Sequence, residues 1–254
     1  MAMCMAILFA VVVLLSGCTQ AGPRTISTHK RKSISVHKTS IVEVQTKAGG
    51  FSGGESMEVS GLTDIRKGDG LIAAVFAESG EPSAAYPTVT SVSGGGVTFS
   101  KVATYQLHPY IYFTMQIWVG TNSSGGQTTV TADLGGGALA DGALFVGEFL
   151  GLASTPFDAS TSSSGSTFET TYRTPSLTPR APDELFWAVG RWPNVMGTTP
   201  ARPWSGLVSG TDHSLVSLWT IPTGASAQQG SWTNDGDDAE DVTLVACFKA
   251  SVPS

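Results

Sequence analysis

Hydrophobic residues beyond position 40 fall into short runs, each opened by a turn dipeptide. Gly68-Asp69 precedes one apolar run and Pro182-Asp183 precedes another, and each run has six or seven residues. Runs of this length are typical of strands buried on one or both faces. The segment 128–134 alternates instead, as in a half-buried strand. Because no stretch of helical period after residue 40 lacks Gly or Pro, we expect about 12 to 16 short antiparallel strands.

The same order of segments occurs twice, which predicts an internal duplication. Asp69 and Asp183 lie 114 residues apart at the start of matching runs, and Trp118 and Trp219 lie 101 apart in matching central segments. Two further matches, 129–131 with 231–233 and 145–149 with 244–248, are separated by 102 and 99 residues. We therefore predict an all-β, two-layer antiparallel β-sandwich of the jelly-roll type over residues 41–254, in which each half contributes strands to both sheets.

The first 17 residues have a different character, with an apolar run of about 15 residues. This run is too short to cross a hydrocarbon core of about 30 Å and suits a signal peptide. Leu15-Ser16-Gly17-Cys18 resembles the bacterial lipobox, which implies cleavage before Cys18 and lipidation of its thiol. The basic residues usual in such signals are missing from positions 1–5. The alternatives are an uncleaved hydrophobic N-terminal helix and a misassigned start codon.

Residues 18–40 predict a flexible basic tether, because they are rich in Ser, Thr, Lys and His and have no apolar face. The chain has a net charge of −6, of which residues 1–40 contribute +5, so residues 41–254 carry −11. A basic tether next to a lipid anchor would be attracted to anionic headgroups, although a solvated linker without a partner fits the composition equally well. The acidic remainder argues against nucleic acid as a partner.

The strand motifs resemble those of a β-sandwich domain found in bacterial secreted surface proteins and in bacteriophage tail or minor virion proteins. The nearest matches are Gly68-Asp69-Gly70-Leu71 and the terminal Phe248-Lys249-Ala250, and the likeness extends over most of residues 41–250. The resemblance implies a scaffold or attachment role. It carries no catalytic residue over to this chain.

Tryptophan and arginine side by side make the stretch after residue 190 the best candidate for ligand binding. Arg191 precedes Trp192, and Arg202 lies two residues before Trp204. This composition is typical of interaction hot spots and of platforms for sugars. Alternatively, both indoles fold inward and cap one end of the sandwich, in which case full burial of both would remove the binding hypothesis.

A run of acids at 235–241 is the candidate metal site. Asp235, Asp237 and Asp238 place carboxylates in one turn, and Ca²⁺ takes six to eight oxygen ligands. The run does not follow the EF-hand pattern, so a solvated acidic turn is the alternative. We expect no other cofactor.

None of the catalytic motif matches in the sequence defines a convincing active site. Gly50-Phe51-Ser52-Gly53-Gly54 matches G-x-S-x-G but lies in a glycine-rich turn, whereas a nucleophile elbow needs a strand before the serine and a helix after it. The pair Glu78 and Glu81 would suit glycoside hydrolysis only at a separation that sequence does not give. Cys247 lies in an apolar segment and is expected to be a small buried hydrophobe.

Together these features predict a non-catalytic, surface-displayed structural or adhesion protein, exported and anchored to the cell envelope through Cys18. Its expected partners are the membrane and a protein or polysaccharide on a surface, and self-association into a homo-oligomer stays open. The alternative is a bacteriophage virion component, in the tail or as head decoration, with an uncleaved N-terminus. A glycan-binding or glycan-active protein is the third hypothesis.

Overall fold

The computed structural model describes residues 40–51, 53–79, 86–107, 112–135, 139–165, 171–192, 200–209, 215–233 and 241–252. All of these belong to the unit His37–Ser254, one of two units into which the chain divides. The described residues form fifteen strands, a number within the expected range, and contain no helix. Accordingly, no helix long and apolar enough to cross a membrane is found among them.

The first eight strands, called copy 1 here, form two antiparallel sheets. The inner sheet of copy 1 has the order β1-β8-β3-β6-β5, and its outer sheet has the order β2-β7-β4. The inner strands are β1 (Val42–Phe51), β3 (Gly70–Ser79), β5 (Ser100–Leu107), β6 (Phe113–Gly120) and β8 (Leu139–Leu150). The outer strands are β2 (Ser56–Val59), β4 (Val89–Gly94) and β7 (Val130–Leu134).

The remaining seven strands, called copy 2, repeat this arrangement. The inner sheet has the order β9-β15-β11-β13-β12, which is the order of copy 1 strand for strand. Its strands are β9 (Leu152–Gly165), β11 (Leu185–Arg191), β12 (Ser205–Ser209), β13 (Leu215–Thr220) and β15 (Asp241–Ala250). The outer sheet pairs β10 (Thr171–Arg173) with β14 (Ser231–Thr233), and a bridge from Pro200 to Trp232 stands where β4 lies in copy 1.

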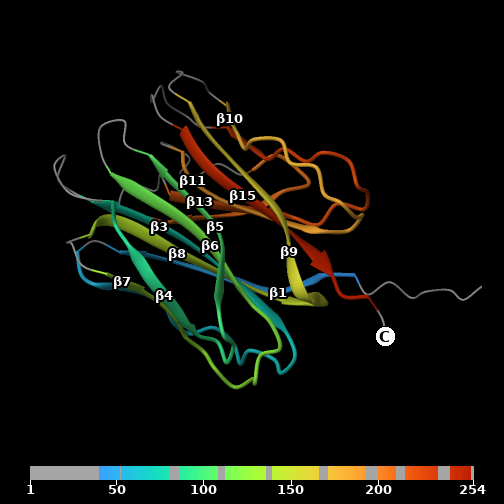
Figure 1. Ribbon diagram of the computed structural model, residues 1–254, viewed down its shortest axis with the longest axis horizontal. Coiled ribbons are helices and arrows are strands. Elements are labelled where there is room, and N and C mark those ends of the chain that lie inside the picture. Colours follow the sequence, from blue (N-terminus) through green and yellow to red (C-terminus); the bar gives the residue numbers. More distant parts are fainter. Residues whose placement is uncertain are drawn as a thin grey trace, which may run out of the picture. The chain divides into compact units, whose positions relative to one another are not determined.

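The antiparallel all-β sandwich and its internal duplication are therefore confirmed, with one difference in layering. Each copy builds both of its own sheets, whereas the sequence suggested that each half would contribute to two shared sheets. The two inner sheets face each other across one apolar core, and each outer sheet covers the far side of its own inner sheet across another. Figure 1 shows the strands of copy 1 and copy 2 on the two sides of this central contact.

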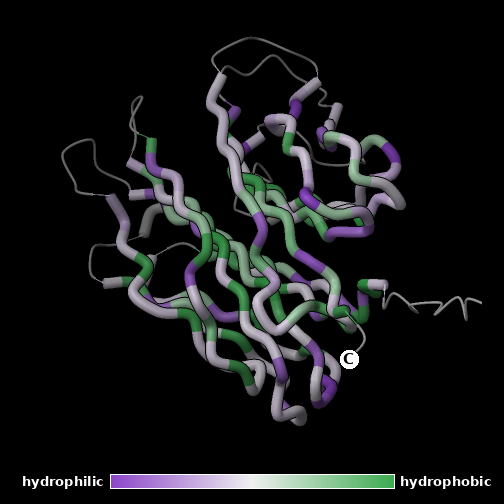
Figure 2. Tube along the Cα trace, turned by 45° about the vertical axis from the view of Figure 1, so that its right-hand side comes forward, coloured by the Kyte–Doolittle hydropathy of each residue, from purple (hydrophilic) through white to green (hydrophobic). Residues whose placement is uncertain are grey.

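Strand β3 shows why the apolar runs are continuous rather than alternating. Ile72 and Phe76 point into the core between the inner sheets, while Leu71 and Val75 point into the core beneath the outer sheet. Successive side chains of a strand lie on opposite faces, so a strand covered on both faces needs apolar residues at every position. In Figure 2 hydrophobic residues are accordingly concentrated along the central strands.

The two inner sheets approach closely at Gly147 of β8. A Cβ atom added to Gly147 would lie 2.6 Å from the ring of Trp187 in β11, closer than carbon atoms pack. Trp187 is fully buried, stacks on Trp219 with ring centroids 5.3 Å apart, and meets Phe149 edge-on at 5.7 Å. The missing side chain of Gly147 therefore makes room for the largest ring of the central core.

Strand pairing corrects two of the four repeat matches by one residue. Phe149 and Phe248 do occupy matching positions, both in the central core. Following the pairing from there, Val119 rather than Trp118 matches Trp219. Likewise Glu184, not Asp183, matches Asp69. The reason is the two-residue period of a strand, since a shift by one residue moves every side chain to the opposite face.

Candidate functional site

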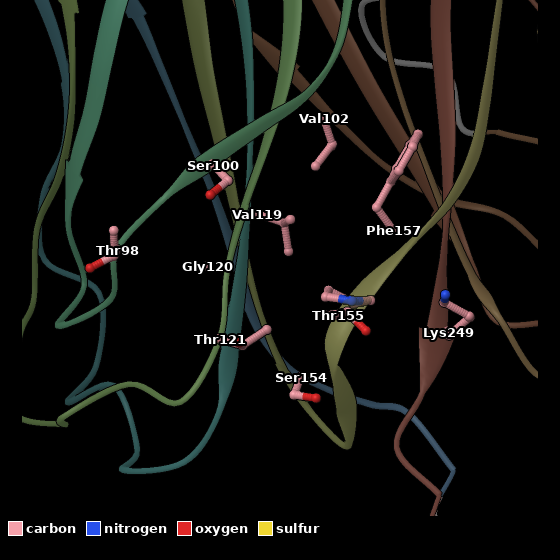
Figure 3. A pocket seen from close by; sticks show the side chains of 11 residues that line it. Thr98, Ser100, Val102, Val119, Gly120, Thr121, Ser154, Thr155, Phe157 and Lys249 are labelled. Carbon is pink, nitrogen blue, oxygen red and sulfur yellow. The ribbon is translucent and has the colours of Figure 1, made fainter.

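One cavity lies where the two copies meet, between the edge of β5–β6 and the edge of β9–β15. Its volume is about 300 Å³. The apolar part of its wall comes from Val102, Val119 and Phe157. Lys249 of β15 lines the same space and is the one cationic side chain among the described residues of the lining. Figure 3 shows strands of copy 1 on one side of the cavity and Phe157 with Lys249 on the other.

Hydroxyl groups make up most of the polar lining. They belong to Thr98, Ser100, Thr121, Ser154 and Thr155. All but Thr121 are exposed, so the hydroxyl-bearing residues of the lining are accessible to solvent. None of the described residues that line the cavity is an acid or a histidine. The lining thus offers hydrogen bonds, one aromatic ring and one positive charge, but no general base.

The cavity arises from a difference between the two copies. At the matching contact, Trp219 takes the place of Val119 and Glu43 takes the place of Phe157. There the indole Nε1 of Trp219 donates a hydrogen bond of 2.7 Å to Glu43 Oε2, and the indole is only 5% exposed. A tryptophan fills one side of the interface between the copies, and the smaller valine leaves the other side open.

The two tryptophans that the sequence singled out for binding are buried. Trp192 is fully buried, donates from Nε1 to Thr243 Oγ1 at 3.1 Å and stacks on Tyr172 at 6.2 Å. Trp204 is 6% exposed and packs edge-on against Phe186. Both indoles fold inward and fill the core between the sheets of copy 2, so the hypothesis that they form a ligand platform is wrong, and of the alternative only the inward folding is seen.

The two arginines of that hypothesis lie apart from the cavity. Arg191 Nε is 4.0 Å from Glu78 Oε2, an ion pair that joins the end of β11 to the end of β3. The carboxyl group considered for hydrolysis thus takes part in a contact between the copies. Arg202 is exposed in the turn before β12. Neither arginine lines the cavity.

Several sequence candidates fall outside the described residues. These are Cys18 with the preceding signal segment, the tether up to residue 39, Glu81, and the acidic residues Asp235, Asp237 and Asp238. The G-x-S-x-G match begins with the last two residues of β1 and runs toward β2. It therefore belongs to a strand-to-strand connection rather than to the strand-to-helix turn of a nucleophile elbow, and Ser52 itself is outside the described residues.

A buried polar cluster that the sequence did not reveal lies in copy 2. Asp158, Glu184 and Cys247 place one ligand atom each within 4.8 Å of the others. Burial and then the negative charge of Asp158 raise the pKa of Glu184. Burial and then the charge of Glu184 raise the pKa of the Cys247 thiol to about 12. Cys247 is buried as expected, but its contacts with two carboxyl groups could not be read from its apolar segment.

Copy 1 has a related cluster at the matching positions. Asp69 corresponds to Glu184, and Glu148 corresponds to Cys247. Burial, followed by the neighbouring Glu148 carboxyl group, raises the pKa of Asp69 to about 6. Gln45 Nε2 donates to Glu148 Oε2 at 2.5 Å, and the backbone N–H of Arg66 donates to Glu148 Oε1 at 2.7 Å. Here an amide side chain and a backbone amide satisfy the buried acid.

Comparisons with known proteins gave no match, whether to a family model, to a curated protein or to a solved structure.

Proposed function

We propose that this protein is a non-catalytic, surface-displayed adhesion protein that binds an acidic saccharide unit in the cavity between its two copies. The observation that carries the proposal is the cavity itself, with its several hydroxyl groups, its Phe157 side chain and Lys249. Its volume of about 300 Å³ is at the lower end of ligand pockets, which suits a single sugar ring.

The chemistry of the lining favours a sugar with a negative charge. Serine and threonine hydroxyl groups both donate and accept hydrogen bonds, as sugar hydroxyl groups do. An aromatic wall such as Phe157 gives the apolar face of a sugar ring a surface to pack on. Lys249 is a compact cation with three donors, suited to a carboxylate or sulfate group. Because the lining contributed by the described part of the chain contains no acid or histidine, binding is better supported than hydrolysis.

Display at a surface follows from the N-terminal segment. Lipidation of Cys18 would leave the 23 residues 19–41 between the lipidated residue and β1. Such a segment spans at most about 80 Å when fully extended. The cavity would then be held beyond the lipid headgroups and accessible to surface polysaccharide.

Binding is tested with the full-length protein, using alginate, a uronic acid polymer, and dextran as the neutral comparison. We expect retention on alginate and not on dextran. Val119→Trp, which introduces the residue of the matching position in copy 2, should abolish retention by filling the cavity. Lys249→Gln should weaken binding about 10-fold or more, the value of a hydrogen bond to a charged group.

Lys101→Gln is the matched control, because Lys101 is an exposed cation of β5 that lies over the Trp118 ring rather than in the cavity. It should bind alginate as the parent does. Equal retention of the parent and Val119→Trp would show that the cavity is not the site. If Lys249→Gln and Lys101→Gln lost retention on alginate equally, the overall charge of the protein, and not a contact of Lys249 in the cavity, would explain the binding.

Anchoring is tested separately by expression in bacteria with labelled palmitate, followed by membrane fractionation. We expect label in the parent and none in Cys18→Ser. A soluble, unlabelled protein that keeps Met1 would defeat the lipid anchor and favour the virion alternative.

A further inference from the structure

The buried cluster of copy 2 gathers three metal-binding side chains from distant parts of the chain. Asp158 lies at a bulge in β9, Glu184 directly precedes β11, and Cys247 lies in β15. Their ligand atoms all lie within 4.8 Å of one another. Glu184 and Cys247 are fully buried, and Asp158 is 8% exposed. Three strands of one sheet thus hold two carboxyl groups and a thiol together away from water.

One oxygen in this cluster accepts no hydrogen bond of normal geometry from the described residues. Glu184 Oε1 accepts a hydrogen bond from the backbone N–H of Ala181 at 3.1 Å, whereas Glu184 Oε2 is buried with only the Cys247 thiol and the Asp158 carboxyl group as polar neighbours that act on the Glu184 side chain. Buried polar atoms are nearly always paired, and leaving a carboxyl oxygen unpaired costs free energy. An oxygen left in this state beside a thiol and a second carboxyl group is a ready ligand for a cation.

Copy 1 differs from copy 2 at the position of Cys247, although Asp69 Oδ2, at the position of Glu184, is buried without a partner among the described residues as well. There Gln45, opposite Glu148 in the strand pairing, supplies an amide donor to the buried acid. In copy 2 the residue opposite Cys247 is Ala159, which has no polar side chain. The bulge at Asp158 adds a third acidic group instead. Copy 1 therefore has a hydrogen-bond donor, Gln45, next to its acid, whereas copy 2 has an additional anionic group, Asp158.

We propose that Asp158, Glu184 and Cys247 bind one Zn²⁺ ion. Zinc takes thiolate and carboxylate ligands in a tetrahedral arrangement, and a sulfur ligand favours it over Ca²⁺ or Mg²⁺. Sulfur and oxygen ligands of a tetrahedral zinc lie about 3.6 Å apart, by the usual bond lengths. Cys247 Sγ is already 3.9 Å from Asp158 Oδ2, so small side-chain movements complete the site. The fourth position is left for water.

Charge balance supports the same assignment. Two carboxylates and a thiolate around Zn²⁺ leave a net charge of −1, and the thiol proton passes to solvent on binding. Arg180 Nη1 lies 3.7 Å from Asp158 Oδ1 and can offset that charge. The Arg180 backbone N–H also donates to Asp158 Oδ2 at 3.1 Å. Because the Arg180 side chain is 76% exposed while that of Asp158 is 1% exposed, the site lies one side chain below the surface.

This zinc site shares no residue with the lining of the saccharide cavity, although Asp158 directly follows Phe157 of the cavity wall. An ion bound there would join β9, β11 and β15 and stabilise copy 2, because a ligand that binds only the folded state raises stability.

The site is tested in the full chain carrying Cys4→Ser and Cys18→Ser, so that Cys247 is the only thiol, after treatment with a chelator. Titration with ZnCl₂ should give one ion per chain and a higher melting temperature. Titration with CoCl₂ should give a thiolate-to-cobalt charge-transfer absorption. Cys247→Ser should remove that absorption and weaken zinc binding by at least about 100-fold, the upper end of losses seen for supporting residues.

Asp158→Asn and Glu184→Gln should weaken zinc binding while leaving the unfolding curve of the zinc-free protein cooperative. Glu148→Gln, at the position that matches Cys247 in copy 1, is the matched control and should bind zinc as the parent does. A triple variant, Asp235→Asn with Asp237→Asn and Asp238→Asn, should keep the cobalt absorption. No charge-transfer absorption in the parent, or equal zinc affinity in the parent and Cys247→Ser, would overturn the proposal.

Discussion

The acid pair of copy 1 makes the stability of the protein depend on pH in an unusual direction. Asp69 is 2% exposed, and its Oδ2 atom has no hydrogen-bond partner. Burial and the adjacent Glu148 raise its pKa from 3.8 to about 6. The folded protein therefore holds the Asp69 proton more tightly than the unfolded chain does. Asp69→Asn replaces the carboxyl group with an uncharged group of the same shape whose amide can donate to Glu148.

The sign and size follow from proton linkage. A raised carboxyl pKa stabilises the fold fully below pH 3.8, and this contribution is lost as the pH rises to about 6. The shift of the Asp69 pKa from 3.8 to about 6 corresponds to about 3 kcal/mol of unfolding free energy, because a shift of one pKa unit is equivalent to about 1.4 kcal/mol. Asparagine does not titrate. Relative to the parent, Asp69→Asn should therefore gain up to about 3 kcal/mol above pH 6 and little at about pH 4.

The assay is urea unfolding of both proteins, followed by tryptophan fluorescence, at several pH values from about 4 to about 8. The difference between the two unfolding free energies removes the contribution of titrating groups that do not contact Asp69, and it reports on Asp69 together with its neighbour Glu148. A difference that stays constant across this range, or a variant less stable than the parent at neutral pH, would refute the argument that Asp69 is ionised at a cost in the fold.

Two further predictions concern the packing of the cores. Gly147→Ala should lower the unfolding free energy by about 1–3 kcal/mol, because its Cβ would overlap the Trp187 ring, whereas Gly224→Ala, with open space around it, should unfold as the parent does. Equal denaturation midpoints for the two variants would contradict this close approach. Cys247 should resist iodoacetamide in the zinc-free native protein and react after unfolding, because burial holds its thiol pKa near 12. Mass spectrometry of the peptide decides this, and modification before unfolding would show that the thiol is accessible.

The local pattern of apolar residues along the chain predicted much of the fold. The continuous apolar residues of β3 and β11 predicted strands covered on both faces, and that is where both strands lie. The repeated order of segments predicted a duplication, and the two inner sheets share one strand order. The signal segment and Cys18 remain predictions of the sequence alone.

Matching residues between the copies needed strand pairing. Trp118 and Trp219 look equivalent in sequence, yet Trp118 lies under the outer sheet and Trp219 in the central core. The alignment paired the two residues because both are tryptophan, and it ignored the two-residue period that sets the face on which a side chain lies. The position that truly matches Trp219 is Val119, and the cavity depends on that difference.

The sequence by itself determined the class of fold, the duplication and the division of charge between a basic N-terminal segment and an acidic remainder. Only the tertiary structure decided which faces meet and which side chains gather. Asp158, Glu184 and Cys247 share no local motif, and the hydroxyl groups of the cavity are residue types common throughout the chain. The physical reason is that side-chain periodicity along a strand reports burial. Neighbours across and between sheets are set by pairing, bulges and packing over long separations in sequence.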